Sequence, residues 1–159
     1  MTTRPMFTKQ TVLPALEATS IEAAFDELLA VCAEEHGFGD DIRKTVRSML
    51  RRKAEQGATG AIGHGVAVPH VKVAGVESTN VVFARSLQGI DFGAPDGAPV
   101  NLFFFVVGPE DAPEAHLNFM RWVATISRNA DFRRFAIACK DTTELLDLLD
   151  EMSESSSSS

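Results

Sequence analysis

The chain has 159 residues, of which 45% are apolar, and a formal net charge of −7 at pH 7. A chain of this length can bury roughly two thirds of the surface that its unfolded form exposes, which is enough for one core. The negative charge disfavours nucleic acid and anionic lipid as partners. Since no apolar stretch is long enough for a spanning helix, and residues 1–10 contain no continuous apolar segment like that of a signal peptide, we expect one cytoplasmic domain that does not insert into a membrane.

The first third of the chain predicts two amphipathic helices. Apolar residues recur at helical spacing over residues 20–35, behind a Ser20 cap and ahead of Gly37, which suits a helix end. A second helix is expected from residue 40 or 41 to just before Gly57, with a basic cluster at residues 43–53 as a solvated face. Each of the two cysteines, Cys32 and Cys139, lies in a helical apolar pattern, which predicts reduced core residues.

The middle of the chain predicts strands. The candidates are "VAV" at residues 66–68, "STNVVFARS" at 78–86 and "PVNLFFFVVG" at 99–108. The last run has eight consecutive apolar or nearly apolar positions, which indicates a strand covered on both faces. The segment 89–99 is rich in glycine and proline, and we expect it to form a hairpin-like loop near the edge of the sheet.

The last third predicts helices again. One begins near Asp111, which has capping-box spacing to Glu114, and two shorter helices are expected near residues 131–139 and 142–151. The serine-rich segment 153–159 is expected to be a disordered tail, so that the folded domain comprises residues 1–152. The order of elements favours an α/β sandwich, a single domain with a mixed β-sheet flanked by helices on both faces. In the first of these helices we expect a buried stripe of Leu117, Met120, Val123 and Ala124.

The stretch "GATGAIGHGVAVPH" at residues 57–70 is the strongest chemical signal. It lacks the Gly-Lys-Ser/Thr ending of a P-loop and the glycine order of a dinucleotide site, so a nucleotide cofactor is not expected. Its glycines allow close backbone approach, and Pro69 stiffens the segment that presents His70. A histidine held in this way is suited to nucleophilic work, because neutral imidazole can form a covalent bond through one nitrogen while the other is anchored.

A second histidine, His116, falls in the first turns of the helix that is expected from Asp111. The positive end of the helix dipole favours a neutral imidazole, which can still donate one N–H. If this helix start lies beside His70, then His116 and free backbone N–H groups can bind the oxygens of an anion attached to His70. An exposed histidine on a capped helix is the alternative reading of His116.

Several of these motifs, in this order, resemble a known family. They are the glycine-rich stretch ending in Pro69-His70, the segment 89–93 with Asp96-Gly97, and the segment from Pro109-Glu110 to His116-Leu117. The chain is similar, from about residue 6 to 151, to the enzyme IIA domain of the fructose/mannitol type in the bacterial phosphoenolpyruvate-dependent sugar phosphotransferase system. This family includes the nitrogen-regulatory IIA proteins.

The resemblance implies a phosphotransferase with a phosphohistidine intermediate and no cofactor or metal. His70 matches the histidine that accepts phosphate from HPr or a homologue, and His116 matches the histidine that assists at the phosphoryl group. The acceptor is then a cysteine on a IIB domain or, in the regulatory branch, a target protein whose binding depends on the phosphorylation state. The fold that the resemblance implies is also a mixed sheet flanked by helices.

The chain departs from the family pattern at two places. Lys53-Ala54 replaces the usual Arg-Glu, and His64 replaces a frequent asparagine within the glycine stretch. A lysine keeps the charge but loses the bidentate fork of arginine, so the role near the phosphoryl group passes to Lys53 or to its neighbour Arg52. We therefore expect a supporting set around the two histidines, namely Lys53, Arg52, His64, Gly63 and Gly65.

Other readings stay open at this point. A histidine-rich metal-binding protein would use His64, His70 and His116 as imidazole ligands. Within the phosphotransferase reading, a chain that carries neither a spanning segment nor a IIB cysteine loop favours nitrogen regulation slightly over sugar transport. Partner docking requires an apolar surface near His70, for which Val66, Val68 and Val71 are candidates, although alternating strand residues more often face the core.

Overall fold

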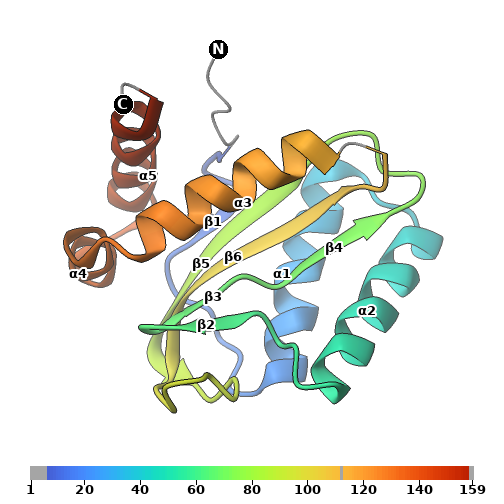
Figure 1. The fold of residues 1–159 in the computed structure, drawn as a ribbon, viewed down its shortest axis with the longest axis horizontal. Helices are drawn as coiled ribbons and strands as arrows, with labels where there is room; N and C mark the ends of the chain where they lie inside the picture. Colours follow the sequence, from blue (N-terminus) through green and yellow to red (C-terminus); the bar gives the residue numbers. More distant parts are fainter. Residues whose placement is uncertain (1–6, 112, 158–159) are drawn as a thin grey trace.

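The computed structural model describes residues 7–111 and 113–157, which form one sheet between two layers of helices (Figure 1). The strands are β1 (Val12–Leu13), β2 (Ala61–Gly63), β3 (Val66–Ala67), β4 (His70–Val73), β5 (Asn80–Ile90) and β6 (Val100–Pro109). The helices are α1 (Ile21–His36), α2 (Asp40–Glu55), α3 (Pro113–Ser127), α4 (Ala130–Ala138) and α5 (Thr142–Ser157).

The sheet is mixed, as the sequence predicts. Its six strands run in the order β1-β5-β6-β3-β2, with β4 also paired to β6. The long strands β5 and β6 are antiparallel, whereas β1 runs parallel to β5, and both β3 and β4 run parallel to β6. The loop between β5 and β6 therefore joins two central strands and does not lie at an edge of the sheet.

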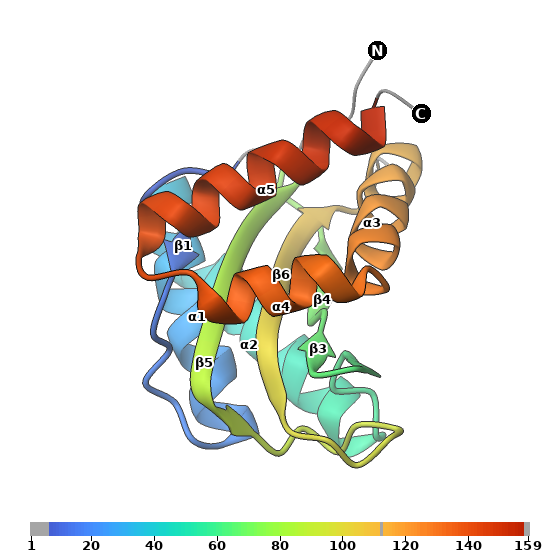
Figure 2. The same ribbon diagram turned by 90° about the vertical axis from the view of Figure 1, so that its left-hand side faces the viewer.

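Strand β6 is covered on both faces, which confirms the expectation from its continuous apolar run. Phe103, Phe105 and Val107 belong to the core with α1 and α2, whereas Phe104 and Val106 belong to the core with α3, α4 and α5. Figure 2 shows α4 and α5 crossing one face of the sheet, with α1 and α2 behind it. Alternate residues of a strand point to opposite faces, so this one strand contributes to both cores.

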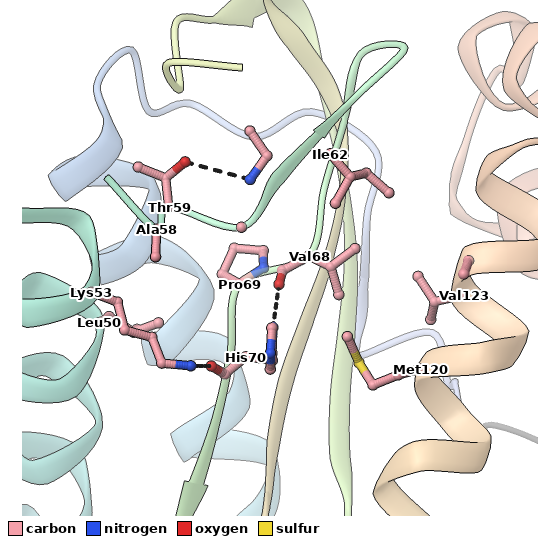
Figure 3. Close-up of a pocket in the computed structure, with 13 residues that line it drawn as sticks. Leu50, Lys53, Ala58, Thr59, Ile62, Val68, Pro69, His70, Met120 and Val123 are labelled. Carbon is pink, nitrogen blue, oxygen red and sulfur yellow. Dashed lines mark hydrogen bonds between the residues drawn. The ribbon is translucent and has the colours of Figure 1, made fainter. Parts of the chain in front are cut away.

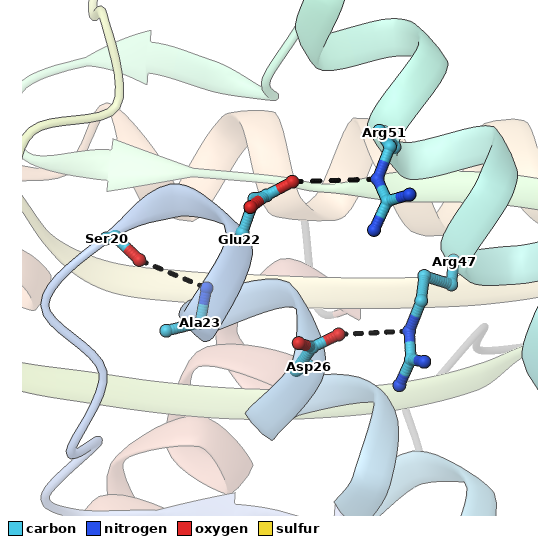
Figure 4. Close-up of polar contacts among 6 residues, drawn as sticks. All are labelled: Ser20, Glu22, Ala23, Asp26, Arg47 and Arg51. Atoms are coloured by element: carbon cyan, nitrogen blue, oxygen red, sulfur yellow. Dashed lines mark hydrogen bonds and ion pairs between the residues drawn. The ribbon is translucent and has the colours of Figure 1, made fainter.

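Helices α1 and α2 match their predicted bounds closely and are held to each other at the surface. Ser20 caps α1 by accepting from the Ala23 N–H, and Gly37 ends it in a left-handed conformation, with a φ of 70°. Two arginines of the basic cluster on α2 pair with carboxylates on α1 (Figure 4). The pairs are Arg47 with Asp26 at 3.0 Å and Arg51 with Glu22 at 3.5 Å.

The prediction of which α3 residues face the core is wrong, because the helix is rotated about its axis relative to the expectation. Val123 is buried and Met120 and Ala124 are half-buried, but Leu117 is 48% exposed. The face that packs on the sheet instead contains His116, Phe119, Val123 and Ile126. Both series repeat at helical spacing, so the helix is rotated by one position relative to the expectation, and it turns His116 inward.

Helices α4 and α5 complete the second layer. Helix α5 continues to Ser157, and so it includes residues 153–157 of the predicted tail; residues 158–159 lie outside the described part. The buried Arg85 of β5 donates from its guanidinium to the carbonyls of Ala136, Ile137 and Cys139 at the end of α4. These bonds satisfy carbonyls that a helix end leaves without partners. Within the described residues, no helix is both long and apolar enough to cross a bilayer.

Candidate functional site

His70 begins β4, directly after a break in one strand of the sheet. Strands β3 and β4 pair with β6 with the same offset, since Ala67 lies opposite Phe103 and His70 opposite Val106. They are therefore two parts of one strand, interrupted at residues 68–69. The carbonyl of Pro69 still accepts from the Val106 N–H at 3.0 Å, so the interruption leaves the direction of the strand unchanged. Pro69 has no N–H to donate, which is tolerated at a sheet edge.

The break orients the imidazole of His70. Its Nδ1 lies 2.7 Å from the carbonyl oxygen of Val68, and the bond is visible in Figure 3. Because a carbonyl can only accept, Nδ1 carries the proton and Nε2 carries the lone pair. No hydrogen bond within the described residues involves Nε2, and the side chain is half-buried, so this nitrogen remains available.

Gly60 makes this backbone arrangement possible. It has a φ of 96°, and a Cβ at this position would lie 2.7 Å from Pro69 N and 2.8 Å from the carbonyl carbon of Val68. The carbonyl of Gly60 accepts from the Val68 N–H at 2.7 Å. The sequence prediction includes Gly60 only as part of the glycine-rich stretch, whereas the structure places it directly against the segment that holds His70.

The other glycines named from the sequence lie elsewhere. Gly63 and Gly65 flank His64 in the turn between β2 and β3, and all three have positive φ values. The Asp96 carboxylate accepts from the His64 N–H at 2.9 Å, and this bond helps to hold the pKa of Asp96 below its usual value. The family asparagine is replaced here by a residue that still adopts the left-handed conformation, with a φ of 58°. These residues shape the hairpin and do not line the pocket beside His70.

His116 lies beside His70, as the sequence predicts. The two ring centroids are 5.7 Å apart and the ring planes are inclined by 41°. His116 is only 7% exposed, and its Nδ1 is buried without a hydrogen-bond partner in the described part of the chain. The ring lies against Gly108 of β6, where an added Cβ would come within 3.3 Å of Nδ1.

Lys53 reaches the same site from the last turn of α2. Its Nζ donates to the carbonyl oxygen of His70 at 2.8 Å (Figure 3). That carbonyl points away from β6, toward the open edge of the sheet, so the lysine satisfies an acceptor that has no strand partner. Arg52, the alternative from the sequence, is exposed and donates to Ser48 of its own helix at 3.4 Å. The structure therefore places Lys53 at the site and Arg52 outside it.

The electrostatics of the site favour neutral imidazoles. Burial lowers the pKa of His70, and Lys53 and Lys72 lower it further against the opposing effect of the Val68 carbonyl. Burial also lowers the pKa of His116, and the charges of His70, Lys72 and Lys53 act in the same direction. Both rings are consequently neutral near pH 7, which is the state that a nucleophile and a neutral N–H donor require.

A pocket of about 450 Å³ opens beside His70, between α2, the β2–β3 hairpin and α3. Its walls are mainly apolar, and the larger lining side chains are Leu50, Ile62, Val68, Met120 and Val123 (Figure 3). Of the candidates Val66, Val68 and Val71 for a docking surface, Val66 and Val71 are wrong because they are almost fully buried, whereas Val68 lines the pocket although it is only 3% exposed. Two exposed apolar residues lie close to the histidines in the fold or the sequence: Ile62, which lines the pocket, and Leu117, which follows His116 on α3, are each 48% exposed.

The structure does not bring together the three histidines of the metal-binding alternative. His70 and His116 are neighbours, but His64 lies in the hairpin turn and is not among the residues that line the pocket beside His70. Among the residues that the structure describes, no group of three or more His, Cys, Asp and Glu could hold a metal ion.

One charged residue of the site is absent from the sequence prediction. Lys72 follows His70 by two positions on β4 and is exposed. Two-residue spacing within a strand places side chains on the same face, so the signal is present in the sequence. The spacing is informative only if a strand follows His70, and the apolar pattern predicts a strand before His70, at residues 66–68.

Comparison with known proteins identifies the family. Residues 5–152 match the family described as "Phosphoenolpyruvate-dependent sugar phosphotransferase system, EIIA 2". The chain therefore belongs to this family of enzyme IIA domains, as the resemblance predicts.

Individual relatives come from both branches of the family. The chain is 34% identical over 140 residues to a nitrogen regulatory protein of Bradyrhizobium diazoefficiens, covering 88% of this chain and 89% of the relative. It is 33% identical over 141 residues to a fructose-specific EIIA component of Haloferax volcanii, covering 89% and 87%.

Solved structures share the fold. Nitrogen regulatory protein IIA-Ntr from Neisseria meningitidis matches with a TM-score of 0.80 and 25% identity, covering 89% of this chain and 94% of the other. Enzyme IIAMtl, solved in complex with phosphorylated enzyme IIBMtl from Escherichia coli, matches with a TM-score of 0.74 and 16% identity, covering 92% and 98%.

Proposed function

We propose that the protein is a phosphoryl carrier that accepts a phosphoryl group on Nε2 of His70 and passes it on. The observation that carries this proposal is the bond from His70 Nδ1 to the Val68 carbonyl, which assigns the lone pair to Nε2 in a half-buried position beside a second imidazole. Membership of the enzyme IIA family supports the same reaction class. A fixed, neutral imidazole with one free nitrogen is what nucleophilic transfer requires.

The electron pairs and the charge in this transfer are accounted for without a metal or an added base. The Nε2 lone pair of His70 forms a new P–N bond in line as the P–N bond of a phosphohistidine donor breaks. The donor ring, protonated on its other nitrogen, keeps the electron pair of the broken bond and leaves as neutral imidazole. The His70 ring then carries the positive charge, and its Nδ1–H remains bonded to the Val68 carbonyl, which stabilises this state.

His116 and Lys53 take different supporting roles. His116 Nδ1 has no hydrogen-bond partner within the described residues, so we assign the proton of the neutral ring to Nε2, where an incoming phosphoryl oxygen can accept from it. That N–H is the donor that we assign to an equatorial oxygen of the phosphoryl group. Lys53 holds the carbonyl of His70 at 2.8 Å and so acts as a positioning residue for the backbone that carries the nucleophile.

The apolar surroundings of His70 support docking of a protein partner. The pocket and the exposed Ile62 and Leu117 provide a hydrophobic surface around a reactive nitrogen, as expected where a partner must exclude water during transfer. The proposed donor is an HPr-like phosphocarrier, and the proposed acceptor is a IIB cysteine or a regulatory target. IIAMtl, which shares the fold, has been solved in complex with phosphorylated IIBMtl, so a IIB acceptor is the alternative that an experiment must distinguish from a regulatory target.

Of the two physiological roles, we propose nitrogen regulation over sugar transport. Likeness to a nitrogen regulatory protein in sequence, at 34% identity, and to IIA-Ntr in fold, at a TM-score of 0.80, supports this choice. The role is tested by offering the phosphorylated protein a purified IIB domain. Rapid loss of the phosphoryl group to a IIB cysteine would assign the protein to transport instead.

The carrier function is tested by incubating the protein with phosphoenolpyruvate, enzyme I and an HPr-like protein, followed by intact-mass measurement. The wild type should gain one phosphoryl group, and His70→Ala should gain none. His36→Gln, at the end of α1, serves as a matched histidine control and should be phosphorylated like the wild type. A full gain in His70→Ala would overturn the assignment.

A further inference from the structure

We propose that Lys72 is a catalytic residue whose ammonium group contacts the phosphoryl group on His70, while Lys53 only positions the backbone. The inference rests on the proposed function, because it concerns the same phosphoryl group. It gives Lys72, an exposed residue of β4, the cationic role that the family resemblance gives to Lys53 or Arg52 in the last turn of α2.

Strand geometry places Lys72 on the reactive face of the sheet. Val71 and Val73 are buried in the core with α1 and α2, so His70 and Lys72 point to the opposite face. Val106, opposite His70 in the register, belongs to the core on that same face, beneath α3. Lys72 and His70 thus project toward the side from which His116 approaches.

Gly108 connects Lys72 to His116. It pairs with Lys72 in the register of β4 and β6, and the His116 ring lies against it. Since Gly108 has no side chain, nothing on that position of β6 stands between the base of Lys72 and the His116 ring. The two residues therefore approach the phosphoryl position from neighbouring positions, one along β4 and the other from α3.

The two lysines differ in what they already bind. The Lys53 ammonium is engaged by the His70 carbonyl at 2.8 Å, at the edge of the sheet. Lys72 makes no hydrogen bond or ion pair with any residue that the structure describes, and its side chain is exposed. A flexible ammonium group without a partner is free to bind an incoming phosphoryl group, whereas Lys53 would have to give up its bond to do so.

The charges around the site are consistent with this division. Lys72 acts on His70, on His116 and on Lys53, lowering the pKa of each. Lys53 on α2 and Lys72 on β4 lower the pKa of both imidazoles, and His70 also lowers the pKa of His116. No carboxylate of the described residues contributes to either shift. A phosphoryl group on His70 would bring negative charge into a site whose neighbouring charges are cationic.

The expected effect is a slower transfer with a changed titration of the product. Because an exposed ammonium is screened by solvent, we expect Lys72→Met to slow phosphorylation of His70 about 10- to 100-fold. Lys72→Arg should retain most of the rate. Loss of the nearby cation should also raise the pKa of the phosphoryl group on His70, which a 31P NMR titration of the phosphorylated protein measures directly.

Lys140→Met is the matched control, because Lys140 is exposed in the connection between α4 and α5 and loses the same charge away from the site. It should leave both the rate and the phosphoryl pKa unchanged. If Lys72→Met slows transfer from the protein donor but the phosphoryl pKa stays at its wild-type value, then Lys72 contacts the partner and the inference is wrong. If the wild type is not phosphorylated at His70, the proposed function itself fails.

Discussion

The rings of His70 and His116 lie 5.7 Å apart at an inclination of 41°, although the two residues come from a strand and a helix that are separated by the central hairpin of the sheet. Two local features produce this relationship. The break at Val68–Pro69 turns His70 so that Nδ1 bonds to a carbonyl, and Gly108 lets the first turns of α3 bring His116 against β6. The pair forms only when strand and helix are both in place.

Replacement of His116 separates its chemical role from its structural one. His116→Leu removes the proposed donor to the phosphoryl group, and we expect phosphorylation of His70 to slow by about 100-fold or more. Since Nδ1 is buried without a partner, an apolar side chain should leave the urea midpoint unchanged or raise it. Stopped-flow phosphotransfer and urea unfolding measure the two effects. Wild-type transfer kinetics in the variant would assign His116 to structure alone.

The pH dependence follows from the direction of the two imidazole shifts. Burial lowers both pKa values below the usual 6.5. As pH falls, these histidines are therefore protonated at a higher pH in the unfolded chain than in the folded protein. Stability should therefore decrease as pH falls through 6.5, and the loss should level off below the folded-state pKa values. Transfer should persist at pH 6.5, because the His70 lone pair is still free, and should decline at lower pH.

Two measurements check this pH dependence. NMR titration of the ring protons gives the folded-state pKa values, and urea midpoints at several pH values give the stability. In the double variant His70→Gln, His116→Gln neither ring can be protonated. Its stability should therefore decrease less than that of the wild type as pH falls through 6.5. A His70 pKa above 6.5 would contradict the expectation.

Much of the fold could be predicted because its signals are local. Ser20 and Gly37 bound α1 as expected, and the apolar run of β6 identified a central strand. The short strands β1 and β2 were missed because two or three residues carry no readable alternation, and β4 was missed because its alternation covers only four residues; the pairing of all three depends on distant partners.

For the candidate site, the proximity of the two histidines could be expected from the sequence, but their surroundings could be predicted less well. The buried stripe of α3 was displaced by one position because His116 counts as polar in a periodicity analysis, although the structure buries it. Val66 and Val71 were assigned to a docking surface because alternation does not say which face of a strand is the core. The close approach of Gly60 to Pro69 is a tertiary contact, which no spacing reveals.

Lys53 should matter for position more than for charge alone. In Lys53→Met the carbonyl of His70 loses its donor, and we expect a loss of about 1.5 kcal/mol in the free energy of unfolding, the low end for hydrogen bonds to charged groups, because the bond is only partly buried. The pKa of His70 should rise because a nearby cation is gone. Arg52→Met, on the next residue and exposed, is the control and should change neither quantity. If Lys53→Met and Arg52→Met changed the stability and the His70 pKa equally, this would contradict the role assigned to the hydrogen bond from Lys53 to the His70 carbonyl.

Gly60 and Gly57 provide a matched test of the backbone that carries His70. Both have positive φ values, of 96° and 80°, but an added Cβ meets the backbone of residues 68–69 within 2.8 Å at Gly60 and nothing within 4 Å at Gly57. Gly57→Ala should therefore cost only the backbone strain, about 1 kcal/mol. Gly60→Ala adds a steric clash and should cost about 3 kcal/mol or more.

The clash at residue 60 should also affect function, since it displaces the carbonyl that holds His70 Nδ1. At a temperature where Gly60→Ala remains folded by circular dichroism, phosphorylation of His70 should be slower than in Gly57→Ala. The NMR titration of His70 should shift as well, because the Val68 carbonyl raises its pKa and a displaced carbonyl cannot. If the two alanine variants have the same stability and the same rate, the segment that holds His70 does not depend on the close approach at Gly60.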